Sequence, residues 1–269
     1  MIETDFLEIQ SKLGNYKYSS MQYLEYSYVS QYEIILKRDE CILLYGFNEK
    51  EGCHEYHFAA NTQEDILKET QHNPCLITFV PEEWITEFEK AGFVVCAAFC
   101  DYFMESLEGV SECGEPEFLK EDECKEAADV TIACRGQSRG FHGETPEWIR
   151  EWINTPGDTD DDLEYLHRAI LTERNEQAEI VGIVVTALYG FESEKGAVSW
   201  IREAAVKPEY QRKGIARKLI TQALYYGKNH GAKRAFLAAD ECNIHAIHLY
   251  ESIGFRARKD KQINMIKEV

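Results

Sequence analysis

The chain has few of the features that mark membrane, secreted or nucleic-acid-binding proteins. No apolar run approaches the roughly 20 residues that a membrane-spanning helix needs. The first residues, MIETDFLEIQ, have neither the basic start nor the apolar core of a secretory signal. Basic residues are scarce, since 29 Lys and Arg stand against 48 Asp and Glu, a formal net charge of −19. A general nucleic-acid binder needs a basic face to displace counterions. We therefore expect neither a nucleic-acid nor a membrane partner.

Disulfide frameworks and metal sites also have little support. The nine cysteines form no C-x-x-C pair, and an odd number in a secreted protein would leave one thiol unpaired. We therefore expect reduced thiols and a cytoplasmic protein. Cys53, His54 and His57 could be a fragment of a metal site, but no second pair follows at metal-ligand spacing. The alternative is that they are ordinary surface or core residues, and we predict no bound metal.

The acidic charge is concentrated in the first half of the chain. Residues 1–115 contain 7 basic and 22 acidic side chains, whereas residues 116–269 contain 22 and 26. The segment 103–117, FMESLEGVSECGEPE, combines charge, Gly and Pro without an apolar period, which is typical of a linker. A chain of 269 residues can form one large domain or two modest ones. We predict two domains, at 1–108 and 116–269.

One stretch, AVSWIREAAVKPEYQRKGIA at 197–216, organises the second half. Its first ten residues are rich in Val, Ile, Trp and Ala and contain no turn residue, which is typical of a strand buried on both faces. Pro208 ends this strand because proline has no N–H to donate. Apolar residues then recur at helical spacing from Ile215 to Ala223. The stretch predicts a strand, a loop over 211–216 and a helix.

This loop combines the features of an anion site. Unpaired N–H groups and the positive end of the helix dipole converge at a helix N-terminus. Gly214 permits a ligand to approach the backbone closely. The nucleotide-binding patterns G-x-x-x-x-G-K-[ST] and G-x-G-x-x-G are absent, so we expect a phosphorylated ligand of another class. Positive charge comes from Arg212, Lys213, Arg217 and Lys218.

The segment V-x-P-x-Y-Q-R-K-G-I-A at 206–216 resembles the acetyl-coenzyme A signature of the GNAT superfamily of N-acetyltransferases, whose loop reads [QR]-x-x-G-x-[GA]. Residues 243–255 match the family's second pattern, N-x-x-A-x-x-[LF]-Y-x-x-x-G-F, in the usual order and spacing. The resemblance covers residues 116–269. It implies an α+β fold with a mixed central sheet flanked by helices, and acetyl-coenzyme A (acetyl-CoA) as cofactor. The residues implied to hold it are the backbone of Ala204, Ala205 and Val206, the loop residues Gln211, Arg212, Lys213, Gly214, Ile215, Ala216 and Arg217, and Asn243.

Direct attack of a neutral amine on a thioester needs a general base, an oxyanion donor and an acid for the leaving thiolate. If Asn243 opens a helix, Tyr250 shares an inward face with Ala246 and Leu249. By resemblance, Tyr250 is the acid that protonates the coenzyme A thiolate. The alternative is a core tyrosine with a satisfied hydroxyl. Cys242 is expected only to pack, because no cysteine nucleophile is required.

The general base is less constrained. Glu203 lies three residues before Val206, where several GNAT families carry a glutamate that faces the acceptor, and the rival interpretation is a buried ion pair with Arg202 or another arginine. His142 is a second candidate because an imidazole titrates near neutrality, whereas His245 and His248 lie off the Tyr250 face. The resemblance also makes two loops candidates for acceptor contact, residues 137–142 and the acidic segment 158–162. An acidic rim favours an amine, although solvated aspartates are the alternative.

The first half contains an echo of the second. An offset of 162 places EFEKAGF, ending at Phe93, on LYESIGF, ending at Phe255, with strands before and after each helix. The same offset places the acidic segment 48–52 on the phosphate loop, where it would repel a phosphate. We therefore predict two tandem GNAT copies, of which the first is degenerate and binds no coenzyme A. The alternative is a common Gly-Phe helix end followed by a strand.

Secondary structure follows from the same patterns. We expect a helix in the first part of 16–32, where tyrosines cluster. The strands expected elsewhere are 33–37, 41–47, 56–60, 75–80, 165–172, 179–189 and 197–206, and the helices are 64–70, 81–90, 120–134 and 146–153.

The sequence predicts an N-acetyltransferase that moves the acetyl group of acetyl-CoA to a primary amine in a ternary complex, with a small molecule as the acceptor. The competing hypothesis is a non-catalytic acyl-CoA sensor or partner-binding module, which would keep the same phosphate loop. Tyr250 and Glu203 favour catalysis, since a sensor would not need them. An unrelated nucleotide-binding protein is the third possibility and would bind ATP but not coenzyme A.

Overall fold

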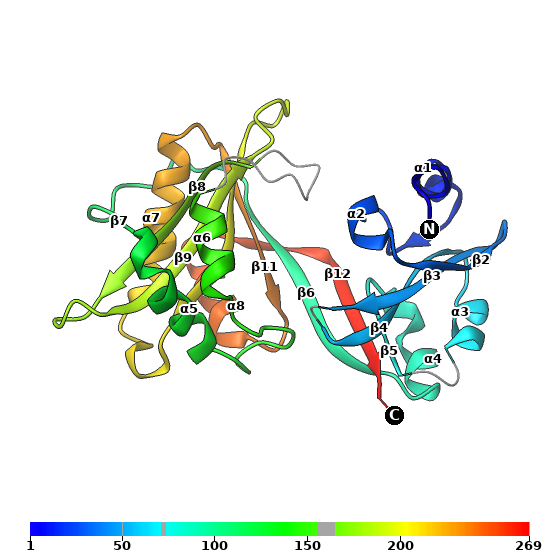
Figure 1. Ribbon diagram of the computed structural model, residues 1–269. Coiled ribbons are helices and arrows are strands. Elements are labelled where there is room, and N and C mark those ends of the chain that lie inside the picture. The colour runs from blue at the N-terminus through cyan, green and yellow to red at the C-terminus, as the bar shows by residue number, and fades with distance from the viewer. Residues whose placement is uncertain (50, 71–73, 155–164, 269) are drawn as a thin grey trace. The chain divides into compact units, whose positions relative to one another are not determined.

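A computed structural model describes residues 1–49, 51–70, 74–154 and 165–268 (Figure 1). The chain forms two compact units. Unit 1 contains Met1–Phe99 and Lys261–Val269, and unit 2 contains Cys100–Asp260. The unit boundary therefore precedes the linker expected at 103–117, and the last residues of the chain group with unit 1. No described helix is long and apolar enough to cross a lipid bilayer.

Unit 2 is a mixed sheet with helices on both faces (Figure 1). Its strands follow the order β6-β11-β10-β9-β8-β7, where β8–β9 and β9–β10 are antiparallel and β10–β11 is parallel. One face packs on α5 and α6, and the other packs on α7 and α8. The elements are β7 Glu117–Phe118, α5 Cys124–Ala133, α6 Pro146–Asn154, β8 Leu166–Arg174, β9 Ile180–Tyr189, β10 Val198–Val206, α7 Ile215–Asn229, β11 Arg234–Asp240 and α8 Ile244–Ile253.

Helix α7 lies unusually close to the sheet at both of its ends. A Cβ atom added to Gly182 on β9 would lie 2.9 Å from Ile215 and 3.1 Å from Leu219. A Cβ added to Gly227 on α7 would lie 2.4 Å from the hydroxyl of Ser199 on β10. These two glycines fix how α7, and hence the loop before it, sits on the strands.

Unit 1 has a smaller sheet with the order β2-β3-β4-β5-β12-β6, and β1 pairs with β4. Residues 261–267 of β12 fill the position beside β5, where Met265 pairs with Ile77. Ile263 and Met265 are buried among the apolar residues of unit 1. The elements are α1 Glu3–Lys12, β1 Tyr18–Ser19, α2 Tyr26–Val29, β2 Glu33–Lys37, β3 Cys41–Asn48, β4 Cys53–Ala60, α3 Glu64–Glu69, β5 Cys75–Ile77, α4 Ile85–Lys90, β6 Val94–Met104 and β12 Arg256–Lys267.

The two units repeat one order of elements. Unit 1 runs β2-β3-β4-α3-β5-α4-β6, and unit 2 runs β8-β9-β10-α7-β11-α8-β12. In both, the second and third strands are antiparallel, and the third and fourth are parallel. The fold has the predicted α+β class, with a mixed sheet flanked by helices.

Two predictions in the first half were wrong in detail. The expected helix within 16–32 is instead β1 and the short α2, while the longer helix α1 lies upstream. The constant offset of 162 also fails at the phosphate loop. The segment at that offset falls after the end of β3 at Asn48 and before the start of β4 at Cys53, whereas the segment that precedes the first-half counterpart of α7 is 61–63. The offset drifts because α3 has 6 residues and α7 has 15.

Candidate functional site

Strands β10 and β11 separate partway along their length. They pair in parallel only from Val198 with Arg234 to Trp200 with Phe236. Beyond Trp200, β10 continues its ladder with β9 alone, and a bulge shifts the register between Ile201 and Glu203. A bulge bends its strand and re-aims its side chains. The edge of β10 from Ala204 to Val206, predicted to receive the acetyl-CoA arm, therefore carries no β11 partner.

The loop after β10 has the geometry of an anion cradle. Gly214, at the N-cap of α7, has φ 82°, and Arg212 has φ 60°. Left-handed residues in such a loop turn successive N–H groups toward one concavity. A Cβ added to Gly214 would meet no atom within 4 Å, so the space outside this glycine is open to a ligand. The predicted loop and the helix that follows it are confirmed.

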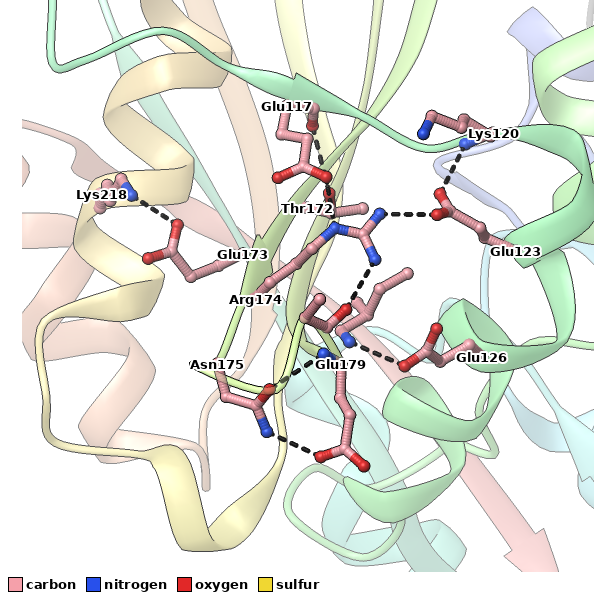
Figure 2. Close-up of polar contacts among 12 residues, drawn as sticks. Glu117, Lys120, Glu123, Glu126, Thr172, Glu173, Arg174, Asn175, Glu179 and Lys218 are labelled. Atoms are coloured by element: carbon pink, nitrogen blue, oxygen red, sulfur yellow. Dashed lines mark hydrogen bonds and ion pairs between the residues drawn. The ribbon is translucent and has the colours of Figure 1, made fainter.

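Not all of the basic side chains near the loop are available to a ligand. Lys218 forms an ion pair with Glu173 (Figure 2), with 2.5 Å between Nζ and Oε2. Arg217 donates to Ser252 Oγ at 2.6 Å, and Lys213 Nζ lies 4.7 Å from the centre of the Tyr210 ring. Arg212 and Lys213 are exposed. Arg217 is exposed as well, so all three side chains can meet a ligand, whereas Lys218 is paired with Glu173.

The side chain of Gln211 holds the loop in place. Its Nε2 donates to the carbonyl of Val206 at 2.9 Å and to Gln137 Oε1 at 3.0 Å. Ile215 packs against the core of unit 2, and Ala216 is half-buried. Among the predicted loop residues, Gln211 and Ile215 therefore shape the cradle, whereas Arg212 and Lys213 face solvent.

Glu203 is buried, with 8% of its surface exposed. Its Oε2 lies 4.0 Å from Arg202 Nη1, but that guanidinium makes a closer ion pair with Glu144 Oε1 at 2.8 Å. Burial, followed by the negative charge of Glu203, raises the pKa of Cys134, which follows α5, and of Tyr250 in α8. The charge of this carboxylate therefore acts both at the end of α5 and on α8.

Tyr250 occupies the inward face of α8, as the helical spacing predicts. Its ring lies 6.4 Å from that of Tyr102 and 6.3 Å from that of Phe255, measured between centroids. Burial, together with the negative charge of Glu203, raises the pKa of Tyr250 to about 12. The hydroxyl therefore keeps its proton throughout the neutral range, which a proton donor requires.

Asn243 is the N-cap of α8, and its Oδ1 accepts a hydrogen bond from the Ala246 amide at 3.4 Å. Its Nδ2 atom is left for other partners, so the capping role is compatible with the predicted contact to acetyl-CoA. The three histidines named above, His142, His245 and His248, are exposed. Of the predicted acceptor loops, 137–142 is described, whereas 158–162 lies outside the described residues.

Sequence reasoning missed two groups of side chains at the site. Arg139 in the α5–α6 loop binds Asp240, the last residue of β11, with 3.2 Å from Nε to each carboxylate oxygen. The second group is an aromatic cluster on the α5–α6 face, which the i, i+4 spacing of its two helix tryptophans could have indicated. Arg202 stacks 4.1 Å from the centre of one of these rings. The cluster comprises Trp148, Trp152, Tyr165 and Trp200.

Comparison with known proteins places these features in a family. Residues 134–255 match the model of the acetyltransferase (GNAT) family. The chain is 29% identical over 103 residues to the spermine/spermidine N(1)-acetyltransferase of Bacillus subtilis, covering 35% of this chain and 66% of that protein. It is 31% identical over 129 residues to the spermidine N(1)-acetyltransferase of Vibrio cholerae, covering 45% of this chain and 74% of that protein.

Comparison with solved structures extends the similarity to most of the chain. A GCN5-related N-acetyltransferase from Sphaerobacter thermophilus superposes with a TM-score of 0.58 at 13% sequence identity, covering 85% of this chain and 76% of that one. At this identity the match concerns the fold alone. Together with the family match, the relative from Vibrio cholerae settles the classification. The chain belongs to the GNAT family of acetyltransferases.

Proposed function

We propose that unit 2 transfers the acetyl group of acetyl-CoA to a primary amine by direct attack in a ternary complex. The observation that carries the proposal is the convergence of three features at one end of β10. These are an anion cradle at the start of α7, a β10 edge without a β11 partner, and Glu203 near Tyr250. Acetyl-CoA fits this arrangement because its phosphates need the anion cradle, whereas its thioester arm needs the hydrogen-bonding groups of the β10 edge.

The residues that would hold acetyl-CoA fit its chemistry. The cradle from Gln211 to Ala216 and the side chains of Arg212 and Arg217 suit the phosphates. The backbone of Ala204 to Val206 and the amide of Asn243 suit the polar groups of the pantetheine arm. When bound, acetyl-CoA supplies the acetyl thioester, and the open space outside Gly214 leaves room for the backbone to be approached.

Two side chains carry the proton transfers. Glu203 accepts a proton from the acceptor ammonium, directly or through water, so that a neutral amine can attack. As the new C–N bond forms and the C–S bond breaks, the Tyr250 hydroxyl gives its proton to the sulfur. The high pKa of Tyr250, about 12, keeps this donor protonated at neutral pH. We therefore expect the rate to rise with Glu203 ionisation and to show no loss from Tyr250 below pH of about 10.

The acceptor is proposed to be a small amine. Two of the similar proteins are acetyltransferases of spermine/spermidine and of spermidine, and β10 carries the buried carboxylate of Glu203, which attracts a cation. We further propose that the protein acts in the cytoplasm, since all nine cysteines are free thiols. Unit 1 is proposed to be a degenerate copy with a structural or acceptor-shaping role.

The first test is calorimetric titration of acetyl-CoA into the full chain, followed by thiol-release assays with spermidine, spermine and other amines. One site per chain and turnover on an amine support the proposal. One site without turnover on any amine favours the sensor hypothesis. Two sites per chain contradict the assignment of unit 1 as degenerate, and competition by ATP but not by coenzyme A contradicts the family's ligand.

A further inference from the structure

The loop between α5 and α6 spans the ends of the two strands that separate. On the β10 side, Gln137 Oε1 accepts from Gln211 Nε2 at 3.0 Å. Also on that side, Cys134 Sγ lies 3.2 Å from the carbonyl of Val206. On the β11 side, the loop is joined to Asp240 through Arg139. The loop is therefore fastened at both strand ends.

The contact on the β11 side is the stronger of the two. The Asp240 side chain is fully buried, whereas the Arg139 side chain is 31% exposed. Arg139 Nη2 also lies 3.2 Å from Glu241 Oε1. Two acidic side chains thus share one guanidinium. Breaking the pair with Asp240 is costly because the buried carboxylate would be left without a counter-charge.

Asp240 transmits this contact to the start of α8. Its Oδ1 accepts from the amide of Cys242 at 2.9 Å, and its carbonyl accepts from the amide of Asn243 at 2.9 Å. Asn243 in turn caps the helix that carries Tyr250. One guanidinium therefore connects the acceptor-side loop to the turn that sets the position of α8.

We propose that Arg139 is a positioning residue for the acetyl transfer. It holds the acceptor-side loop 135–143 against the start of α8, and this aligns the amine with the thioester. This inference rests on the proposed function of unit 2. The printed hydrogen bonds of the guanidinium go to Asp240 and Glu241. The contact of Gln137 with Gln211 and the backbone hydrogen bond of Asn243 do not use it, so loss of Arg139 acts on acceptor use more than on acetyl-CoA binding.

Arg174 provides a matched control within the same unit. Its guanidinium also binds two glutamates, Glu117 and Glu123 (Figure 2), and donates to the carbonyl of Ala178. These contacts join β7 and the segment before α5 to the β8–β9 hairpin, away from Asp240. Replacing Arg174 therefore removes an equally well-paired arginine without touching the α5–α6 loop.

The test compares Arg139→Ala, Arg139→Lys and Arg174→Ala in the full chain with the best amine from the panel. We expect Arg139→Ala to raise the KM for the amine about tenfold while the Kd for acetyl-CoA stays within about twofold. Arg139→Lys keeps the charge and should recover part of the loss, whereas Arg174→Ala lowers thermal stability and leaves the amine KM unchanged. An unchanged amine KM in Arg139→Ala, or equal changes in the two alanine variants, overturns the proposal.

A second measurement decides the matter even if no amine is turned over. Amide hydrogen exchange of the wild type and Arg139→Ala is followed in residues 135–143 and 241–246. Faster exchange in both segments, with unit 1 unchanged, supports the connection through Asp240. Faster exchange in the loop alone overturns it. Absence of turnover by the wild type would contradict the proposed function but not this connection.

Discussion

The two units place different chemistry at the same point of a repeated fold. In unit 2, β10 leads through a loop with a left-handed Gly214 into α7, a helix of 15 residues with no acidic side chain in its first turn. In unit 1, β4 leads through residues 61–63 into α3, which has 6 residues and begins with Glu64 and Asp65. The loop before α7 leaves its amide N–H groups open to a ligand. In unit 1, the first amides of α3 instead lie in the turn that carries Glu64 and Asp65.

This difference shows how one order of elements can present different charge at the same helix start. A helix N-terminus attracts anions because its first amides have no partner within the helix. In α3 the carboxylates of the first turn, Glu64 and Asp65, supply the negative charge that the helix start attracts. The Thr62 hydroxyl hydrogen-bonds to Glu64 and lowers the pKa of its carboxyl. The loop 61–63 also lacks glycine and basic residues. A phosphate would meet like charge there and no cradle.

The largest effect is expected on the rate of acetyl transfer when the proposed proton donor, Tyr250, is replaced. Tyr250→Phe removes the hydroxyl and keeps the ring, so acetyl transfer should fall by ~10²–10⁴-fold while the Kd for acetyl-CoA changes little. Steady-state thiol release and calorimetry measure the two quantities. Tyr102→Phe, which alters a neighbouring tyrosine on β6, is the control and should retain near wild-type rates. Full activity of Tyr250→Phe would remove Tyr250 from the mechanism.

The next effect tests the cradle itself. Gly214→Glu puts a negative side chain into the open space before α7, so we expect acetyl-CoA affinity to fall at least about 100-fold. Gly52→Glu in unit 1 is a close match, because Gly52 also has a positive φ, 66°, and no atom within 4 Å of an added Cβ. Both variants carry similar backbone strain, so the difference between them reports the ligand. Equal losses of affinity would contradict the assignment of the cradle to unit 2 alone.

The sequence predicted those parts of the structure that depend on local pattern. The strand, loop and helix around Gly214 follow from an apolar run, a proline and a glycine within a short segment, and α8 follows from helical spacing around Tyr250. The site residues at these positions remain predictions, although their elements are in place. Local pattern could also indicate the repeated units, because helix ends such as Gly92 and Gly254, both with positive φ, leave a mark in the sequence.

Contacts between distant residues could not be predicted in this way. Arg139 and Asp240 are about 100 positions apart, and nothing in either local segment indicates that they meet. The same holds for Met265, which joins the sheet of unit 1 from the other end of the chain. The offset between the units drifted for a related reason, since α3 is shorter than α7 and a constant alignment cannot account for the lost turns.

A third prediction concerns the stability of unit 1 and its dependence on the last residues. Met265 is fully buried in the unit 1 core, so Met265→Ala should lower the free energy of unfolding of this unit by about 2–5 kcal/mol. Urea unfolding followed by hydrogen exchange in residues 41–60 measures the loss. Acetyl-CoA affinity should stay within about twofold, because the cradle lies in unit 2. A loss of affinity as large as that of Gly214→Glu would contradict the separation of roles.

The smallest effect compares a buried glutamate of unit 1 with an exposed one. Glu55 on β4 accepts hydrogen bonds from Tyr28 at 2.6 Å and Tyr32 at 2.5 Å, and lies 2.9 Å from His57 Nε2. His57 and the two tyrosine hydroxyls outweigh the opposing effect of burial and lower the pKa of Glu55 to about 2. A carboxyl whose pKa is lower in the folded state stabilises the fold above its ordinary pKa. That stability is lost as the pH falls from about 4.5 toward about 2.

Glu55→Gln should therefore cost about 1–3 kcal/mol of unfolding free energy at pH 7, and the difference from wild type should shrink as the pH is lowered. Urea unfolding at pH 7, 4 and 3 measures both. Glu8 provides the control, because its pKa is also lowered to about 2, through Lys12 and Lys37, although its side chain is exposed. Exposed charges are screened by solvent, so Glu8→Gln should change stability much less. Equal losses of unfolding free energy in Glu8→Gln and Glu55→Gln at every pH would contradict this prediction. Burial of the Glu55 network would then add nothing to stability, and the pH dependence would have to come from ion pairs at the surface.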